Sequence, residues 1–379
     1  MNFNGISKKI GRVTFRLPGM LVLLAALLGG AGCKSLVSSN DHQFSRFIGV
    51  DDFSVLDGAR NDGGDLVWLT PEIDPQVSWD QLIISWNADA PPGTFVKVEA
   101  AAIASGFATK FYTLGHWSLD GIKFPRTSMR GQKDADGTVN TDTLVLNQPA
   151  DMLQVRITLG GTNHATPALK FLGFNFSNTR VPPAAHSFNH SAWGKLVAVP
   201  EHTQHGYQNG TGWCSPASLS MVLSYWSQIL KRPELDLTVP QVANAVYDKD
   251  FAGTGNWPFN TAFAGSFPGM RSYVTRLDDL SEVETWIAAG IPVILSTRWD
   301  LLEPGRPADT DGHLIVCIGF TKEGDVVVND PATHLDRGET VRRVYQRDNV
   351  IRAWAKSHNT VYLVYPENVK IPRDDFGHW

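Results

Sequence analysis

The sequence predicts an α+β protein, with an N-terminal all-β sandwich that is jelly-roll-like, followed by a domain of mixed helices and strands. Two observations lead to this prediction. From residue 44 to 178, short runs that alternate polar and apolar residues are separated by turn sequences, with no long helical period. From residue 196 onward, helical and strand patterns alternate. A chain of 379 residues is long enough for two domains with their own cores.

An export signal is expected in residues 1–32. A basic region precedes the apolar run 20–28, which is too short for a good membrane span. The small residues before Cys33 resemble a bacterial lipobox, although Gly30 stands where that pattern usually has leucine. We therefore expect Cys33 to carry a lipid that anchors the protein to a membrane of the bacterial cell envelope. Ordinary secretion is the alternative.

The remaining chain divides by composition into four expected parts. They are a polar tether at 33–43, the β sandwich at 44–178, a linker stiffened by prolines at 179–195, and the second domain at 196–379.

The charge of the chain argues against nucleic acid as a partner. The full sequence has 33 basic and 38 acidic residues. Removal of residues 1–32 takes away four basic residues and no acidic one, which leaves 29 against 38 and a formal charge of −9. A mildly acidic body without a basic stripe does not attract a polyanion.

A cysteine at a predicted helix start is the first candidate for chemistry. A glycine-containing loop ends at Trp213 and Cys214, and Pro216 suits the first turn of a helix. Apolar residues then recur at helical spacing up to Ile229. The free N–H groups and the positive dipole end of a helix start favour a thiolate. Cys214 is therefore a candidate nucleophile. A disulfide between Cys214 and Cys317 is also arithmetically possible.

A predicted β-hairpin supplies a candidate base. His313 opens its first strand and Asp330 closes its second, so both lie towards the open end of the hairpin. The simplest register pairs His313 some three residues beyond Asp330, a gap of roughly 10 Å. A bulge, or the bend at Pro331, has to close that gap. Asn329 is the alternative partner, and alternation sends its side chain to the opposite face from that of Asp330.

These blocks resemble the C39-like cysteine peptidase family over about residues 196 to 367. The resemblance rests on the loop and helix at Cys214, on the lead-in 199–204, and on the hairpin with His313 and Asp330. It implies a papain-like fold and a triad in which Cys214 is the nucleophile, His313 the base and Asp330 the orienting carboxylate. The papain neighbourhood Cys-Gly-Ser-Cys-Trp is absent.

The family also places a glutamine ahead of the cysteine in the oxyanion hole. Gln204 matches the family's lead-in, whereas Gln208 has the shorter, papain-like spacing to Cys214. Gln204 is the preferred residue, and Gln208 stays open.

The resemblance implies an exported cysteine peptidase that hydrolyses peptide bonds, with the β sandwich as an accessory binding domain. Its partners would be a peptide or protein substrate and, through the lipid, a membrane. No cofactor is expected. Two alternatives stay open: an acyltransferase or amide hydrolase that uses the same triad, and an inactive cell-surface binding protein.

The first half offers weaker ligand hints. Four tryptophans could stack on a carbohydrate, although aromatic residues of a sandwich more often form its core: Trp68, Trp79, Trp86 and Trp117. Four oxygen-bearing residues are bunched as in a calcium loop but lack the EF-hand spacing: Asp134, Asp136, Asn140 and Asp142. His186 and His190 are four residues apart, as zinc ligands on a helix would be, but no acidic or cysteine ligand is close in sequence.

Local patterns predict the other elements of the second half. We expect a helix at 239–247, a loop beside the cleft at 250–271, and a helix from the capping-box sequence at 281–284 to Gly290. A buried strand at 291–296, a long loop at 298–311 and a strand at 361–365 complete the prediction.

Overall fold

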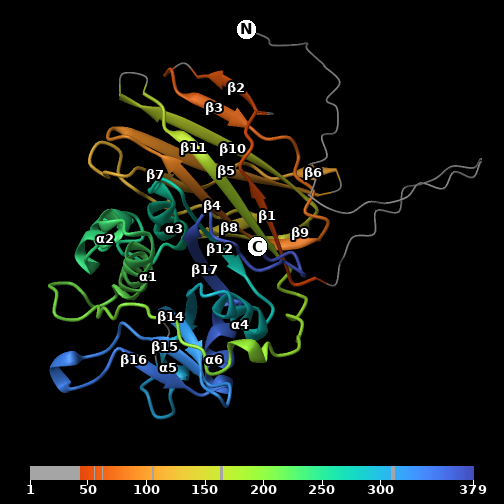
Figure 1. Cartoon of the computed structure of the whole chain (residues 1–379). Helices are drawn as coiled ribbons and strands as arrows, with labels where there is room; N and C mark the ends of the chain where they lie inside the picture. The colour runs from red at the N-terminus through yellow and green to blue at the C-terminus, as the bar shows by residue number, and fades with distance from the viewer. Residues whose placement is uncertain (1–42, 55, 62, 105, 163–164, 309–311) are drawn as a thin grey trace, which may run out of the picture.

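The computed structural model describes residues 43–379 except 55, 62, 105, 163–164 and 309–311 (Figure 1). The predicted leader and the lipidation site Cys33 lie outside the described residues. Among the helices that are described, none has the length and apolar character needed to cross a membrane.

The first half consists almost entirely of antiparallel strands, as predicted. The strands are β1 (Ser45–Val50), β2 (Asp57–Arg60), β3 (Leu66–Leu69), β4 (Trp79–Asp89), β5 (Thr94–Ala104), β6 (Phe107–Ala108), β7 (Tyr112–Trp117), β8 (Gly137–Asn140), β9 (Thr143–Ala150), β10 (Met152–Gly161) and β11 (Ala168–Ser177). One sheet has the order β1-β11-β4-β9-β8, and the other has the order β2-β3-β10-β5-β6, with β7 also paired to β5. Both sheets contribute to one apolar core. The jelly-roll connectivity stays a prediction.

The core of the first half accounts for most of its tryptophans. Trp79, Trp86 and Trp117 are all 0% exposed, as the core interpretation predicts, so the alternative of a sugar-stacking platform of four tryptophans is wrong. Their strand positions point into the core, where large aromatic side chains remove the most apolar surface from water. Trp68 alone is partly exposed, and it stacks on Phe53. Carbohydrate binding elsewhere in this half stays a prediction.

The second half pairs helices with one antiparallel sheet. The helices are α1 (Cys214–Leu230), α2 (Val239–Val246), α3 (Trp257–Ser266), α4 (Leu280–Ala288), α5 (Trp299–Leu302) and α6 (Arg347–Trp354). The strands are β12 (Met270–Arg276), β13 (Val293–Arg298), β14 (Gly312–Phe320), β15 (Val326–Asn329), β16 (Arg342–Tyr345) and β17 (Thr360–Pro366). Their order in the sheet is β12-β17-β13-β14-β15-β16. Helix α1 packs against β14 and β17, as Figure 1 shows.

Two predicted loops contain helices. The expected loop at 250–271 includes α3, and the expected loop at 298–311 includes α5. The segment 250–271 was predicted as a loop from its glycine and aromatic composition. It nevertheless contains a capped helix start, in which the side chain of Asn256 accepts a hydrogen bond from the Phe259 N–H and Pro258 occupies the first turn. The side chains of α3 are buried around the helix, and this burial stabilises the helix in spite of the weak helix propensity of the segment.

Helix α4 begins earlier than its predicted capping box. Asp279 is the N-cap, and its carboxylate accepts a hydrogen bond from the Ser281 N–H at 2.8 Å. Glu284, predicted to close the box, instead accepts hydrogen bonds from the Trp193 indole and the Asn189 N–H, both at 2.7 Å. The segment predicted as a linker is therefore fastened to α4.

The two halves share buried contacts. Phe259 and Ala262 of α3 lie in the apolar core of the first half. Conversely, Phe47 and Phe171 of the first half pack in the core of the second. Between the cores, the buried Asn87 amide pairs with the backbone of Ser272 on β12. Figure 1 shows α3 lying between the strands of the first half and α1.

Candidate active site

Cys214 is the first residue of α1, as the sequence predicts. Its N-cap, Trp213, makes no side-chain cap hydrogen bond, so no cap occupies the backbone N–H donors of the first turn, which point towards the thiol end of the helix. The preceding loop approaches Gln204 so closely that only glycine fits at position 210, since a Cβ there would lie 2.1 Å from the Gln204 carbonyl oxygen. Cys214 is 8% exposed, whereas Cys317 is 0% exposed, and both thiols are free.

His313 lies near the start of β14 and is 5% exposed. Its Nε2 lies 2.7 Å from Asp330 Oδ1, and the Cys214 side chain interacts with the same ring. Because Nε2 is engaged by the carboxylate, Nδ1 is the ring nitrogen left for the thiol. The structure thus brings together the three residues predicted from the sequence.

A β-bulge makes the contact between His313 and Asp330 possible. The pairing of β14 with β15 shifts between Cys317 and Gly319, which leaves Ile318 as the extra residue. Continued past β15, this register places Asp330 two positions from His313 and on the same face of the sheet. Without the bulge the two would be three positions apart and on opposite faces. The bulge therefore both shortens the gap and turns the carboxylate towards the ring.

Asp330 is 1% exposed and each of its oxygens has a protein donor. Oδ1 also accepts the Ala332 N–H at 2.8 Å, and Oδ2 accepts the Tyr345 hydroxyl at 2.5 Å. Arg306 Nη2 donates in turn to the Tyr345 hydroxyl at 3.0 Å. Asn329, the alternative orienting residue, faces away and donates to the carbonyls of Val199 and Pro200 at 3.2 Å each.

Electrostatics couple the buried imidazole to the buried carboxylate. Burial alone would lower the pKa of His313, but the charge and hydrogen bond of Asp330, together with Cys214, raise that pKa above its ordinary value. Burial alone would raise the pKa of Asp330, but His313 and Tyr345 hold it below its ordinary range. The ring is therefore held in its protonated form, and the carboxylate is held ionised.

The two glutamine candidates differ in environment. Gln204 is buried, and its backbone N–H donates at 2.9 Å to the carbonyl of Pro331, the residue that follows Asp330. Within the described residues, its side-chain oxygen has no hydrogen-bond partner. Gln208 is exposed. The structure thus fixes Gln204, and not Gln208, against the hairpin that carries His313 and Asp330.

Tyr345 and Arg306 were not predicted as site residues. Tyr345 is 1% exposed and ends β16, an edge strand that reaches Asp330 only through its pairing with β15. Arg306 lies in the connection that follows α5. No local sequence signal marks either residue, because tertiary structure alone brings Tyr345 to Asp330 and Arg306 to the Tyr345 hydroxyl.

The residues of the proposed calcium loop do not converge. Asp134 accepts from the Tyr112 hydroxyl at 2.5 Å and pairs with Lys110 at 2.7 Å. Asp142 is buried and accepts the Trp257 N–H at 2.8 Å, and burial raises its pKa to about 6. Their oxygens are thus used by different protein donors.

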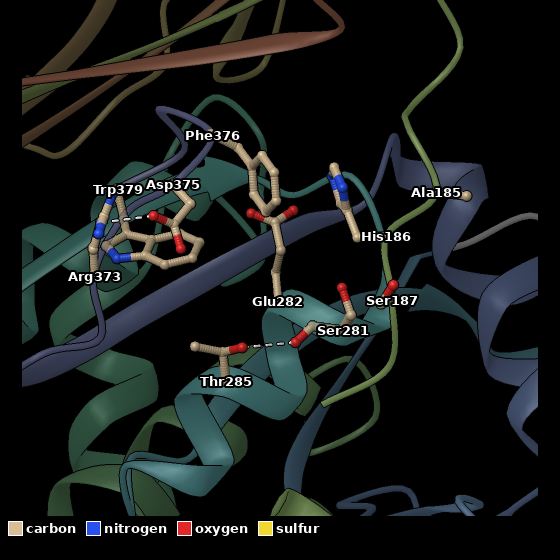
Figure 2. Close-up of a pocket in the computed structure, with 10 residues that line it drawn as sticks. All are labelled: Ala185, His186, Ser187, Ser281, Glu282, Thr285, Arg373, Asp375, Phe376 and Trp379. Atoms are coloured by element: carbon tan, nitrogen blue, oxygen red, sulfur yellow. Dashed lines mark hydrogen bonds and ion pairs between the residues drawn. The ribbon is translucent and has the colours of Figure 1, made fainter. Parts of the chain in front are cut away.

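Among the described residues, one group of side chains has the spacing of metal ligands. His186, Asp278 and Glu282 have ligand atoms within 4.8 Å of one another. His186 and Glu282 also line a hollow of about 440 Å³ (Figure 2). However, His186 Nε2 already contacts Asp278 Oδ2 at 2.7 Å, and Glu282 accepts from the Asp278 N–H and from His378 Nδ1. His190 does not join this group, because its ring lies against Trp193. The atoms are satisfied as a structural network at the start of α4.

A cysteine at a helix start, next to a buried histidine–aspartate pair on the sheet against which the helix packs, is the arrangement of thiol-dependent hydrolases. Two family models match the chain: residues 65–177 match the peptidase C39 N-terminal domain, and residues 197–362 match the Peptidase_C39 like family. Over these two segments the matches confirm the resemblance to C39-like peptidases that the sequence motifs indicated. They suggest a hydrolase of the cysteine-peptidase type.

Other comparisons add little. No curated protein sequence matches the chain. A solved structure from Bacillus anthracis described as a C39-like peptidase is 18% identical, with a TM-score of 0.35, over 46% of this chain and 99% of that one. A likeness at this level carries no argument about the site.

Proposed function

We propose that the protein hydrolyses peptide bonds through Cys214, His313 and Asp330. The observation that supports this most directly is the 2.7 Å contact between His313 Nε2 and Asp330 Oδ1, on a ring that also interacts with the helix-start thiol of Cys214. The raised pKa of His313 keeps a proton available for a departing amine near neutral pH.

In the proposed reaction, the Cys214 thiolate attacks the carbonyl carbon, and a carbon–sulfur bond forms. His313 gives its proton to the amine nitrogen as the carbon–nitrogen bond breaks. His313 then takes a proton from water, which attacks the thioester and returns the thiolate. Asp330 fixes the orientation of the ring throughout. The Gln204 amide and the Cys214 N–H are the proposed oxyanion donors, and loss of one such donor typically costs about 2.7–4 kcal/mol.

The proposal includes a place of action. The basic and apolar leader and Cys33 support export and lipid anchoring at the cell envelope. Metabolic labelling with a fatty-acid probe tests this part: the wild-type chain should be labelled and the Cys33→Ser chain should not.

The catalytic proposal is tested by reaction with iodoacetamide and by proteomic substrate profiling of the soluble form that starts after Cys33. We expect labelling of Cys214 to slow at least tenfold in His313→Ala, and peptide cleavage to vanish in Cys214→Ala. Equal cleavage by Cys214→Ala and the wild type would refute the proposal. Transfer of an acyl group to an amine in place of water would identify an acyltransferase, and slow labelling without turnover would identify a binding protein.

A further inference from the structure

The loop 247–256, between α2 and α3, lies next to the candidate nucleophile. Thr254 Oγ1 donates to the Gly212 carbonyl at 3.2 Å, two residues before Cys214. The loop exposes two aromatic side chains, since Tyr247 is 46% exposed and Phe251 is 40% exposed. A polypeptide that approaches the thiol from this side meets the loop.

Three aromatic residues lie on the two segments that this hydrogen bond joins, and we call them the aromatic ledge: Tyr207 and Trp213, which precede Cys214, and Phe251 of the loop. The rings of Tyr207 and Trp213 are 6.0 Å apart, and Tyr207 is 42% exposed. Phe251 covers Gly253, where a Cβ would lie 2.9 Å from the ring, so the phenyl group is held against its own loop. Partly exposed aromatic side chains held in place are suited to bind an apolar group at little entropic cost.

The first half of the chain holds this loop through its backbone. The buried Asp248 accepts the Ser128 N–H at 3.1 Å, and the Lys249 N–H donates to the Arg126 carbonyl at 2.9 Å. The Arg130 N–H donates to Asp250 Oδ2 at 3.1 Å. Three consecutive positions of the loop are therefore tied to alternate positions of 126–130.

Two side chains of the first half hold the ends of the same loop. The Arg126 guanidinium, 7% exposed overall, donates to the Asn244 carbonyl at 2.6 Å and to the Tyr247 carbonyl at 3.2 Å, at the end of α2. It also donates to the carbonyls of Ser118 and Leu119 in its own half. Asp142 accepts the Trp257 N–H at the other end, where α3 begins. The loop is thus fixed at both ends by residues outside the second half.

We propose that the first half is a structural part of the substrate-binding cleft, in which Arg126 positions the loop 247–256 so that the aromatic ledge receives an aromatic or large aliphatic side chain of a polypeptide substrate. This inference rests on the proposed function and goes beyond it, since it names the substrate class and gives the β sandwich a role other than that of a separate binding module.

The ledge is tested by peptide binding to the full soluble chain carrying Cys214→Ala, so that no turnover is needed. Fluorescent peptides that contain phenylalanine or leucine should bind at least fivefold more weakly when Phe251→Ala or Tyr207→Ala is added. Peptides with only glycine and serine should change by less than twofold. Phe107→Ala, which removes a ring of similar exposure (47%) from β6 of the first half, is the matched control. An equal effect on both kinds of peptide, or none, overturns the proposal.

The positioning role is tested by Arg126→Lys, which keeps the charge but cannot reach the same set of carbonyls. We expect KM for phenylalanine peptides to rise at least fivefold, with kcat within twofold and an unchanged rate of Cys214 alkylation. Arg156→Lys, whose arginine pairs with Glu99 within the first half, is the control and should leave KM unchanged. A fall in kcat with unchanged KM contradicts positioning. If the wild type binds but cleaves no peptide, the proposed hydrolysis fails while the ledge stands.

Discussion

Asp330 decides how strongly the candidate imidazole holds its proton. The carboxylate contacts His313 at 2.7 Å and raises its pKa, so its removal should lower that pKa. In Asp330→Asn we expect kcat/KM to fall by about 10²–10⁴, because the ring loses both its orientation and the charge that stabilises its protonated form. The high-pH limb of the profile should move to lower pH.

Asp336→Asn is the matched control for this change, since Asp336 lies six residues further along the chain with a largely exposed side chain. A pH profile of kcat/KM for both variants makes the comparison. An unshifted limb in Asp330→Asn would show that His313 does not supply the titrating proton.

Tyr345 offers a milder change at the same carboxylate. Its hydroxyl donates to Asp330 Oδ2 and lowers the pKa of Asp330. A carboxylate whose pKa is lowered on folding stabilises the protein above its ordinary pKa, and that contribution disappears as pH falls through the lowered value. In Tyr345→Phe the pKa of Asp330 should rise, so the acid limb of activity and of stability should move to higher pH.

The size of this effect follows from a single hydrogen bond to a charged group, about 1.5–3 kcal/mol, or a loss of about 10- to 150-fold in kcat/KM. Tyr365→Phe removes a buried hydroxyl that bonds only Tyr273 among the described contacts, so it should affect thermal stability without affecting activity. Equal activity losses in the two variants would argue against a specific role for Tyr345.

At the scale of single elements, the bulge in β14 depends on a glycine beside it. A Cβ on Gly319 would lie 2.3 Å from the Lys195 carbonyl oxygen, where the segment after residue 190 crosses the strand. Gly319→Ala should therefore cost about 1–3 kcal/mol of unfolding free energy. Gly312→Ala is the control in the same strand, because no described atom lies within 4 Å of a Cβ there. Urea unfolding measures both, and equal midpoints would contradict the tight crossing.

The sequence predicts elements better than it predicts their alignment. Apolar periodicity and the proline in the first turn were enough to place Cys214 at or just before the start of α1, and the structure shows it as the first residue of the helix. The need for a bulge or bend was deduced from strand geometry, but its position at Ile318 was not. The bulge lies beside the crossing of Lys195 over Gly319, a tertiary contact that no local pattern signals. Helix α3 escaped prediction for a similar reason, since burial against the first half stabilises a segment of poor helix propensity.

At the scale of the whole molecule, the division into two domains understates how the halves are joined. Phe259 of α3 lies in the core of the first half, edge-on to Trp86 at 6.1 Å. No pattern in the sequence predicts that a residue of one half packs in the core of the other, because apolar periodicity shows that a residue is buried but not in which core. The loop 247–256 and Arg126, which holds it, also lie along this junction.

The shared packing predicts one cooperative unfolding transition. Phe259→Ala should lower the unfolding free energy by about 3–5 kcal/mol, the usual cost of a buried phenylalanine, and should shift the signals of both halves together. Calorimetry together with tryptophan fluorescence measures this, and Phe107→Ala serves as the exposed control. Two separate transitions, with only one shifted, would show that the halves unfold independently.

The burial of Cys317 has a practical consequence for spectroscopy. Burial raises the pKa of this thiol to about 12 and leaves it 0% exposed, so in the folded soluble form it stays inert to a maleimide or a trifluoromethyl tag. Cys214 then remains as a single addressable sulfur in the native sequence. A fluorine nucleus attached there would report, without any background substitution, on how the neighbouring aromatic residues rearrange in solution.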